Sequence, residues 1–371
     1  MRVLVTDGTM KKSLAVVRAI SDVASEIGVA SEYRFSTASL SRDADRRFHL
    51  PDRSPKALIE GYNQIAEDHG YDYLLPVGGR TFELVSAHRD QLAYPMDCLL
   101  PNHEALMTAI QKSSTYELAR AEGVPTPETW SVTNLHELNR LSRSVSYPVV
   151  LKTGTETEPR FVRIASNATD LRRAYRAYVS THDSDPLVQV YLPGASRGFF
   201  CLFLEGKLHG GYAHRRIREF PPEGGASACA QSELDDELRA YTEQLLSSLD
   251  WHGVAMVEFK ESATGVPHLV EINPKFWGSL DLGVASGMNF PAGLLAWAAD
   301  EDPLEFGFRP SRVHWPLSGD LMHAVRRPRS APEVFWDLLS RETRSNIRIN
   351  DPVPHVVEGM VNAVSSAKQF N

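Results

Sequence analysis

Two stretches of sequence decide the fold of this chain: Val254-Ala255-Met256-Val257-Glu258-Phe259 and His268-Leu269-Val270-Glu271-Ile272-Asn273-Pro274. Both are rich in β-branched and aromatic residues, which favour strands. The segment Ser262-Ala263-Thr264-Gly265 lies between them and supplies turn residues. Together the three segments predict an antiparallel hairpin.

The predicted hairpin brings two carboxylates together. If the chain reverses around Thr264 and Gly265, antiparallel pairing sets Glu258 opposite Glu271. Because side chains alternate between the two faces of a strand, Asn273 shares the face of Glu271. The opposite face would point to the core, and it would carry Val257, Phe259, Val270 and Ile272.

Two like charges that face each other on a sheet repel, so the pair needs solvent or a cation between its members. Mg²⁺ takes oxygen ligands, usually from one or two carboxylates and from substrate phosphates. The pattern therefore predicts a divalent metal site with Glu258, Glu271 and Asn273 as ligands. The alternative is a solvated hairpin face that carries two ordinary glutamates.

The composition is that of an ordinary globular protein. The chain has 371 residues, of which 42% are hydrophobic and 23% charged, and this length allows two or three domains. Its formal charge of −8 argues against nucleic acid as a partner. No stretch approaches the ~20 apolar residues of a membrane span, and no signal peptide is apparent. We therefore expect a cytoplasmic protein, with buried thiols at Cys98, Cys201 and Cys229.

The first 100 residues alternate strand and helix patterns, which predicts a parallel α/β domain. Strands are expected at 3–6, 33–35 and 73–77, and helices at 14–27 and 56–68. Asp7-Gly8-Thr9 and Gly78-Gly79-Arg80 follow two of these strands, at the edge where open α/β sheets bind ligands. Each is a candidate substrate contact, and a simple turn is the alternative.

Residues 101–192 mix helix and strand patterns. Ser114-Thr115-Tyr116-Glu117 fits a capping box that opens a helix, which places Lys112 just ahead of the first turn. Strands are predicted at 149–152, 161–164 and 187–192, and a helix at 171–179. Beyond this region, a further helix is predicted at 234–249. The last 70 residues show no clear periodicity.

The order of segments from Lys112 to Pro291 resembles the ATP-grasp superfamily, in particular its carbamoyl-phosphate-synthase-like and carboxylate-amine ligase branch. The family's metal and triphosphate strand is similar to Val270-Glu271-Ile272-Asn273-Pro274-Lys275-Phe276-Trp277-Gly278-Ser279. The other matching segments, in the family's order, are Lys112 before Gly123-Val124-Pro125-Thr126-Pro127, Tyr147-Pro148-Val149-Val150-Leu151-Lys152, Val188-Gln189-Val190-Tyr191-Leu192-Pro193-Gly194 and His214-Arg215-Arg216-Ile217-Arg218-Glu219-Phe220-Pro221-Pro222-Glu223-Gly224-Gly225.

The resemblance implies a fold of mixed α/β and α+β class. An N-terminal parallel α/β domain over 1–100 would precede a two-subdomain ATP-grasp fold. The N-subdomain, or lid, would span 101–192, and the C-subdomain with the metal site would span 193–305. Residues 306–371 would form a C-terminal extension.

The resemblance also implies ATP and Mg²⁺, or Mn²⁺, as cofactors. The implied residues are Glu258, Glu271 and Asn273 for the metal, Lys112, Lys152, Gln189, Tyr191 and Leu192 for ATP, and Arg216, Arg218 and Lys275 for catalysis. Lysine suits a polyphosphate because it is a point charge on a flexible stem. The alternatives are that the lysines lie on the surface, that the arginines form a solvated charged run, and that 188–192 is an ordinary core strand.

The implied reaction joins a small-molecule carboxylate to an amine. Attack of the carboxylate on the γ-phosphate of ATP would give an acyl phosphate and ADP, and the amine would then displace phosphate. The loop at 153–160 would close over ATP as a lid. One alternative is carboxylase or carbamoyl-phosphate chemistry, and another is a regulatory protein that binds a nucleotide or Ca²⁺ without turnover. Neither nucleic acid nor a membrane is an expected partner. The oligomeric state stays open, with a homodimer as one option because dimers are common in the family that the chain resembles.

Overall fold

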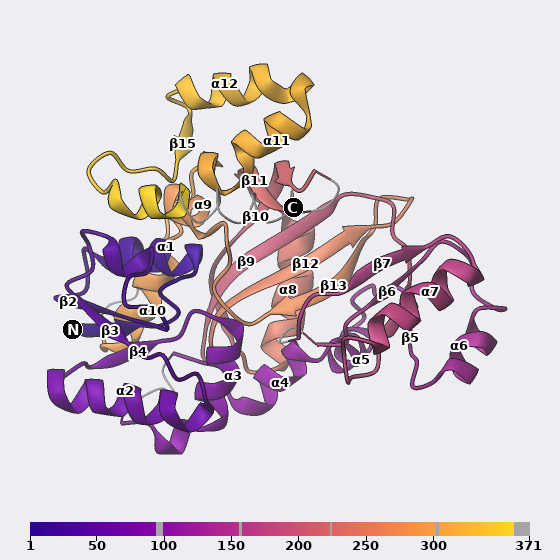
Figure 1. Ribbon diagram of the computed structural model, residues 1–371, viewed down its shortest axis with the longest axis horizontal. Helices are drawn as coiled ribbons and strands as arrows, with labels where there is room; N and C mark the ends of the chain where they lie inside the picture. Colours follow the sequence, from indigo (N-terminus) through magenta and orange to yellow (C-terminus); the bar gives the residue numbers. More distant parts are fainter. Residues whose placement is uncertain (94–98, 156–157, 223–224, 302–303, 360–371) are drawn as a thin grey trace.

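Three β-sheets, with helices on their faces, organise the part of the chain that the structure describes (Figure 1). The computed structural model describes residues 1–93, 99–155, 158–222, 225–301 and 304–359. The small N-terminal sheet, the sheet of the lid and a large C-terminal sheet follow one another along the sequence. The predicted combination of a parallel α/β domain with a two-subdomain ATP-grasp architecture is confirmed.

The N-terminal sheet is parallel, with the strand order β3-β2-β1-β4. Its strands are β1 (Arg2–Val5), β2 (Glu26–Ser31), β3 (Arg46–His49) and β4 (Tyr73–Leu75), and its helices are α1 (Lys11–Ile20), α2 (Pro55–His69) and α3 (Gly79–Ala87). The chain steps outward from β1 to β3 and then crosses to the other side of β1. The loops after β1 and β4 therefore meet at the topological switch point, where such sheets bind ligands.

Two predictions for this domain were wrong. Residues 33–35 form no strand, and the helix that was expected to reach residue 27 ends at Ile20. Ile27 is instead a buried residue of β2. Apolar residues continue through helix, turn and strand at spacings that fit one helical face, so periodicity alone could not separate them.

The lid sheet has the order β5-β8-β6-β7. Its strands are β5 (Thr129–Ser131), β6 (Val149–Lys152), β7 (Val162–Ala165) and β8 (Leu187–Val190), and the neighbouring helices are α4 (His103–Ile110), α5 (Lys112–Ala121), α6 (Leu135–Leu141) and α7 (Ala168–Val179). A separate apolar cluster, which includes Val149, Leu151 and Val188, fills the space between this sheet and the helices α6 and α7, whereas Leu106 of α4 and Ala119 of α5 belong to the main core. The lid thus has a core of its own.

The large sheet has the order β13-β12-β9-β10-β11-β14-β15. Its strands are β9 (Ser196–Leu204), β10 (Lys207–Phe220), β11 (Ala226–Glu233), β12 (Gly253–Glu261), β13 (Pro267–Asn273), β14 (Arg312–His314) and β15 (Thr343–Ser345), and the helices are α8 (Asp236–Ser248), α9 (Leu280–Ala285), α10 (Phe290–Ala298), α11 (Leu321–Arg326) and α12 (Ala331–Leu339). Because β14 and β15 continue the sheet, the segment after residue 305 is part of this subdomain's sheet.

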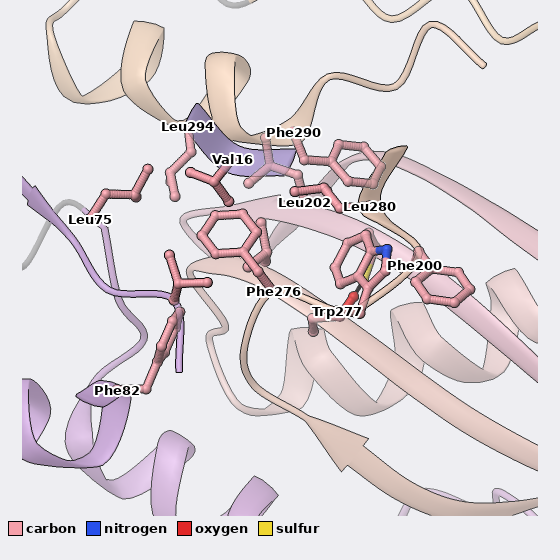
Figure 2. Packing of buried hydrophobic residues seen from close by; sticks show 14 of the residues in the cluster. Val16, Leu75, Phe82, Phe200, Leu202, Phe276, Trp277, Leu280, Phe290 and Leu294 are labelled. Carbon is pink, nitrogen blue, oxygen red and sulfur yellow. Dashed lines mark hydrogen bonds between the residues drawn. The ribbon is translucent and has the colours of Figure 1, made fainter. Parts of the chain in front are cut away.

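The N-terminal and large sheets share one apolar core. Figure 2 shows Phe276 in this core beside Leu75, Phe82 and Val16 of the N-terminal domain. The rings of Phe82 and Phe276 lie 6.4 Å apart in an edge-on arrangement. Because Phe276 follows β13 closely, its burial fixes the end of the strand that carries Glu271.

None of the described helices is long and apolar enough to cross a membrane. Cys201 and Cys229 are buried free thiols, as expected. Cys98 lies outside the described residues.

Candidate active site

The predicted pair of carboxylates lies on the hairpin of β12 and β13. Glu258 is the register partner of Glu271, and Met256 is the partner of Asn273. Gly265 closes the turn with a φ of 84°, a left-handed conformation that glycine adopts without a side-chain clash. The hairpin, its turn and the facing glutamates therefore agree with the sequence prediction.

One detail of the hairpin was predicted wrongly. The register shifts after the glutamate pair, so that Phe259 pairs with Leu269 and Val270 is an extra, bulged residue. Leu269 is buried in place of Val270. The bulge also leaves the Val270 carbonyl free of the ladder, and it accepts a hydrogen bond from the Tyr116 hydroxyl at 2.6 Å.

Lys112 reaches the carboxylate pair from the N-terminus of α5. Its Nζ lies 3.1 Å from Glu271 Oε2, and the side chain is buried. The predicted capping box was wrong, because α5 begins at Lys112 itself with Gln111 as N-cap. The backbone N–H of Lys112 donates to the carbonyl of Gly154 at 2.9 Å, which ties the helix to the loop after β6.

Lys152 ends β6 and is also buried. Its Nζ donates to the Tyr116 hydroxyl at 2.7 Å. Tyr116 therefore links the lid lysine to the bulge of β13. Sequence analysis missed this residue, because its partners lie 36 and 154 positions away along the chain.

The electrostatics of the site are strongly perturbed. Burial and the nearby Glu271 raise the pKa of Glu258. Burial also acts to raise the pKa of Glu271, but Lys112, Lys152 and the Asn273 amide outweigh it, so that pKa is lowered. Burial lowers the pKa of Lys152 to about 8, against the attraction of the two carboxylates. Such opposed shifts within one group of side chains are typical of functional sites.

Asn273 completes the set of side chains with oxygen atoms that could bind a metal ion. Its Nδ2 donates to Glu271 Oε1 at 3.1 Å, which directs its carbonyl oxygen away from that carboxylate. In the part of the chain that the structure describes, no three His, Cys, Asp or Glu side chains are placed to hold a metal ion. Two carboxylates and an amide nevertheless suit Mg²⁺, because that ion takes its remaining ligands from phosphates and water.

Arg216 and Arg218, both on β10, lie against different carboxylates. Arg216 Nη2 lies 3.5 Å from Glu258 Oε1, so this guanidinium belongs to the site. A bulge follows Arg216, and the buried Arg218 pairs with Asp320 at 2.6 Å and Asp337 at 2.5 Å. The two arginines that the family resemblance implied for catalysis therefore lie in different surroundings, and only Arg216 lies beside the carboxylate pair.

Lys275 approaches the site from the end of β13. Burial lowers its pKa, against the attraction of Glu271 and Glu258. A Cβ atom at Gly79 would come within 3.1 Å of the Lys275 side chain, so the N-terminus of α3 lies directly beside it. Lys12, which sequence analysis also missed, donates to the Phe276 carbonyl at 2.8 Å.

The predicted adenine residues lie on β8 and in the connection to β9. Gln189 is buried and donates to Thr129 Oγ1 at 2.7 Å. Tyr191 and Leu192 follow the strand, and the N–H of Tyr191 donates to the Pro148 carbonyl at 3.3 Å. The chain passes here from the lid sheet to the large sheet, as a hinge would.

One face of the lid sheet carries exposed apolar side chains. Register places Ile164 beside Val150 and Val162 beside Lys152, on the face opposite the lid's core. Ile164 is 57% exposed and Val162 is 38% exposed. Gln189 pairs with Val150 and shares this face. An apolar surface with a few polar side chains at its edge suits a nucleotide base.

A small cavity lies at the switch point of the N-terminal sheet. Its lining includes Asp7, Thr9, Glu32, Arg53, Tyr62 and Thr81. Asp7 has a φ of 57°, which is uncommon for a residue other than glycine. Its carboxylate accepts hydrogen bonds from the Gly78 N–H at 2.7 Å and the Thr81 hydroxyl at 2.9 Å. The first candidate loop of the sequence analysis therefore lines this cavity, and the second lies beside it, where Gly78 binds Asp7.

A family model described as "ATP-grasp in the biosynthetic pathway with Ter operon" matches residues 182–314. The carbamoyl phosphate synthase large chain of Vibrio cholerae is 24% identical over 181 residues, which are 46% of this chain and 17% of that one. The corresponding chain of Xylella fastidiosa is 21% identical over 252 residues, 64% of this chain and 23% of that one. The chain thus spans less than a quarter of the length of these relatives.

Solved structures share the fold. The biotin carboxylase domain of 2-oxoglutarate carboxylase from Hydrogenobacter thermophilus, solved with MgADP and bicarbonate, superimposes with a TM-score of 0.68 at 18% identity, covering 84% of this chain and 73% of that one. An N5-carboxyaminoimidazole ribonucleotide synthetase solved with ADP has a TM-score of 0.67 at 14% identity, covering 89% and 85%. The L-amino acid ligase of Bacillus licheniformis has a TM-score of 0.64 at 16% identity, covering 84% and 78%.

Proposed function

Because this chain belongs to the ATP-grasp superfamily, we propose that it is an ATP- and Mg²⁺-dependent ligase that activates a small-molecule carboxylate for attack by an amine. The observation that carries the proposal is the partly buried pair of Glu258 and Glu271, with the buried Lys112 at 3.1 Å from Glu271. A partly buried acidic pair beside a buried lysine is costly unless a ligand makes use of it.

The metal ligands in this proposal are Glu258, Glu271 and the Asn273 carbonyl oxygen. The lowered pKa of Glu271 keeps that carboxylate ionised at neutral pH, as a metal ligand must be. Mg²⁺ would supply charge stabilisation for the terminal phosphates of ATP. Mn²⁺ accepts similar oxygen ligands and could replace it.

The phosphates of ATP would be held by Lys112 and Lys152, with Lys275 beside them. Tyr116 would orient Lys152, because its hydroxyl accepts from the ammonium and is itself fixed to β13. The adenine would lie on the apolar face of the lid near Ile164, with Gln189 and the backbone of Tyr191 and Leu192 at its edge. Catalysis would consist mainly of positioning and charge neutralisation.

The acyl-phosphate chemistry would be served by Arg216, which lies beside Glu258. Arg218 has no part in this proposal, because Asp320 and Asp337 engage it away from the pair. The lid function of the loop at 153–160 remains a proposal, and residues 156 and 157 of that loop lie outside the described residues.

The cavity at Asp7 is the proposed site of the substrate that provides the amine. Asp7 offers negative charge for an ammonium group, and Arg53, which is ion-paired with Glu32, places a guanidinium in the same lining, where it can also meet a substrate carboxylate. The cavity is linked to the carboxylate pair through Gly78, Gly79 and Lys275. An amino acid or a similar zwitterion matches these charges.

The experiment that tests the reaction class is release of ADP and phosphate by the purified chain with Mg²⁺ and an array of carboxylates and amines. Turnover that requires one compound of each kind supports the ligase, and mass spectrometry then identifies the product. Turnover that requires bicarbonate would assign the chain to carboxylase or carbamoyl-phosphate chemistry. Tight ATP binding without turnover in any mixture would contradict an enzymatic function.

The substrate cavity has its own test. Asn tolerates a positive φ, so Asp7→Asn removes the charge and keeps the backbone. We expect the KM for the amine to rise at least about tenfold, the effect of ~1.4 kcal/mol from a lost charge-assisted hydrogen bond, while the KM for ATP stays unchanged. An Asp7→Asn enzyme with an unchanged KM for the amine would exclude this cavity.

A further inference from the structure

Helix α12 has an inverted distribution of side chains. Its outward face carries Phe335, Trp336, Leu338 and Leu339, and Trp336 is 72% exposed. Its inward face includes Asp337, which is buried and ion-paired with Arg218 and Arg312. A surface helix ordinarily places its apolar side chains inside and its charges outside. Helix α12 has a wide apolar face with no partner among the described residues.

Helix α11 adds to this surface. Leu321 and Val325 lie one helical turn apart and are both exposed, and α11 packs against α12. We call the six exposed apolar residues of these two helices the α11–α12 surface: Leu321, Val325, Phe335, Trp336, Leu338 and Leu339. In Figure 1 both helices lie at the outer edge of the molecule, away from the N-terminal sheet and the lid. Exposed apolar clusters of this kind mark interaction sites.

The charge around this surface is opposite to that of the whole chain. Residues 321–344 contain five arginines, at 326, 327, 329, 341 and 344, against three acidic residues, so their formal charge is 5 − 3 = +2 within a chain of net charge −8. Arg329 and Arg341 stand just outside the two ends of α12 and are exposed. The apolar surface thus has a basic rim.

From this combination we propose that the α11–α12 surface docks on a membrane leaflet that contains anionic lipids. Exposed Trp, Phe and Leu side chains insert at the boundary between headgroups and acyl chains, and arginines attract anionic headgroups. The acidic remainder of the molecule would be repelled, so the charge distribution also orients the protein on the leaflet. Docking at this place leaves the carboxylate pair and the lid facing the aqueous phase.

A second copy of the chain fits this surface less well. A two-fold symmetric interface brings the same patch of both subunits together, so the arginine rim of one copy would meet that of the other. Like charges that face each other across an interface disfavour association. The charge complementarity therefore favours an anionic lipid surface over self-association.

The proposal is tested by co-sedimentation of the full chain with vesicles. We expect the protein to pellet with vesicles that contain phosphatidylglycerol, not to pellet with pure phosphatidylcholine, and to be released by salt. Phe335→Ser with Trp336→Ser should lower the bound fraction more than tenfold, because it removes the aromatic side chains that insert into the leaflet. Arg329→Glu with Arg341→Glu should have an effect of the same size, because each arginine near an anionic surface contributes about 1 kcal/mol.

The matched control is Arg173→Glu with Arg176→Glu. These arginines are exposed on α7 of the lid, so the charge change is the same but lies away from the α11–α12 surface. This control should pellet like the unchanged chain, and all variants should keep their circular dichroism spectrum. Failure of the full chain to pellet with the vesicles that contain phosphatidylglycerol would overturn the proposal. An equal loss of vesicle binding in the control variant would overturn it too. So would the finding that the chain forms a dimer and that Phe335→Ser with Trp336→Ser abolishes this dimer.

Discussion

Replacing Tyr116 by Phe tests the proposed phosphate site at its least predictable residue. The Tyr116 hydroxyl accepts a hydrogen bond from Lys152 Nζ at 2.7 Å and donates one to the Val270 carbonyl at 2.6 Å. Lys152 is buried and the hydrogen bond to the Val270 carbonyl is partly buried, so water replaces the lost hydroxyl poorly. A hydrogen bond to a charged group contributes about 1.5–3 kcal/mol and a neutral one about 0.5–1.5 kcal/mol. The free energy of unfolding should therefore fall by roughly 2–4 kcal/mol.

The same substitution should weaken ATP binding. Lys152 loses the group that fixes its orientation. If about half of the stabilisation from the hydrogen bond between Lys152 and Tyr116, up to ~1.5 kcal/mol, is lost from the ATP complex, the Kd for ATP rises about tenfold. Isothermal titration calorimetry measures this Kd, and urea unfolding measures the stability.

Tyr178→Phe is the matched control for this experiment. The Tyr178 hydroxyl is hydrogen-bonded to Ser184 Oγ at 2.6 Å within the lid, so its removal should cost stability without changing the affinity for ATP. If Tyr116→Phe bound ATP within twofold of the unchanged chain, Tyr116 would be a structural residue and the reasoning about Lys152 would be refuted.

Three further predictions concern the carboxylates, the pH dependence and the buried arginine. Glu271→Gln should lower ADP formation at least about a hundredfold, as expected when a group that stabilises transferring charge is lost. The control Glu261→Gln on β12 should not lower it. A Glu271→Gln enzyme with near-normal turnover would exclude the metal site. Lys152 has its pKa lowered to about 8, and ATP binds its charged form, so affinity should be full below about pH 8 and fall by up to tenfold per pH unit above it. Lys152→Arg should flatten that profile, and an equally steep fall in this variant would refute the assignment. Arg218→Met should cost about 3–5 kcal/mol of stability because it leaves the buried Asp320 without its arginine and the buried Asp337 with Arg312 alone, whereas Arg215→Met, which removes an exposed arginine, should change stability by less than about 1 kcal/mol in a chemical denaturation experiment.

The parts of the site that could be predicted from sequence depend on local rules. Turn residues at 262–265 fix the reversal, and the reversal fixes which residues face each other, so the pairing of Glu258 with Glu271 followed from a short segment. The position of Lys152 at the end of an apolar strand likewise indicated a buried charge. Lys112 was found through the family resemblance.

The parts that could not be predicted depend on bulges and on distant partners. A single bulged residue, Val270, changes which side chain faces the core, and the sequence carries no separate signal for it. The bulge after Arg216 separates it from Arg218, whose partners Asp320 and Asp337 lie more than 100 positions further along the chain. Such contacts form only when the sheets are assembled.

The charge balance of the site explains why nucleotide and metal should bind together. Lys112, Lys152, Arg216 and Lys275 surround two carboxylates, so the formal charge of the group is 4 − 2 = +2. Each carboxylate already has a cation beside it, at 3.1 Å for Glu271 and 3.5 Å for Glu258. A bare divalent ion would meet net repulsion, whereas the triphosphate of ATP reverses the local charge and gives the lysines a new partner. Because such coupling is reciprocal, a metal that strengthens nucleotide binding must itself bind more tightly when the nucleotide is present. The carboxylate pair is therefore better suited to a metal delivered with ATP than to a permanent structural ion.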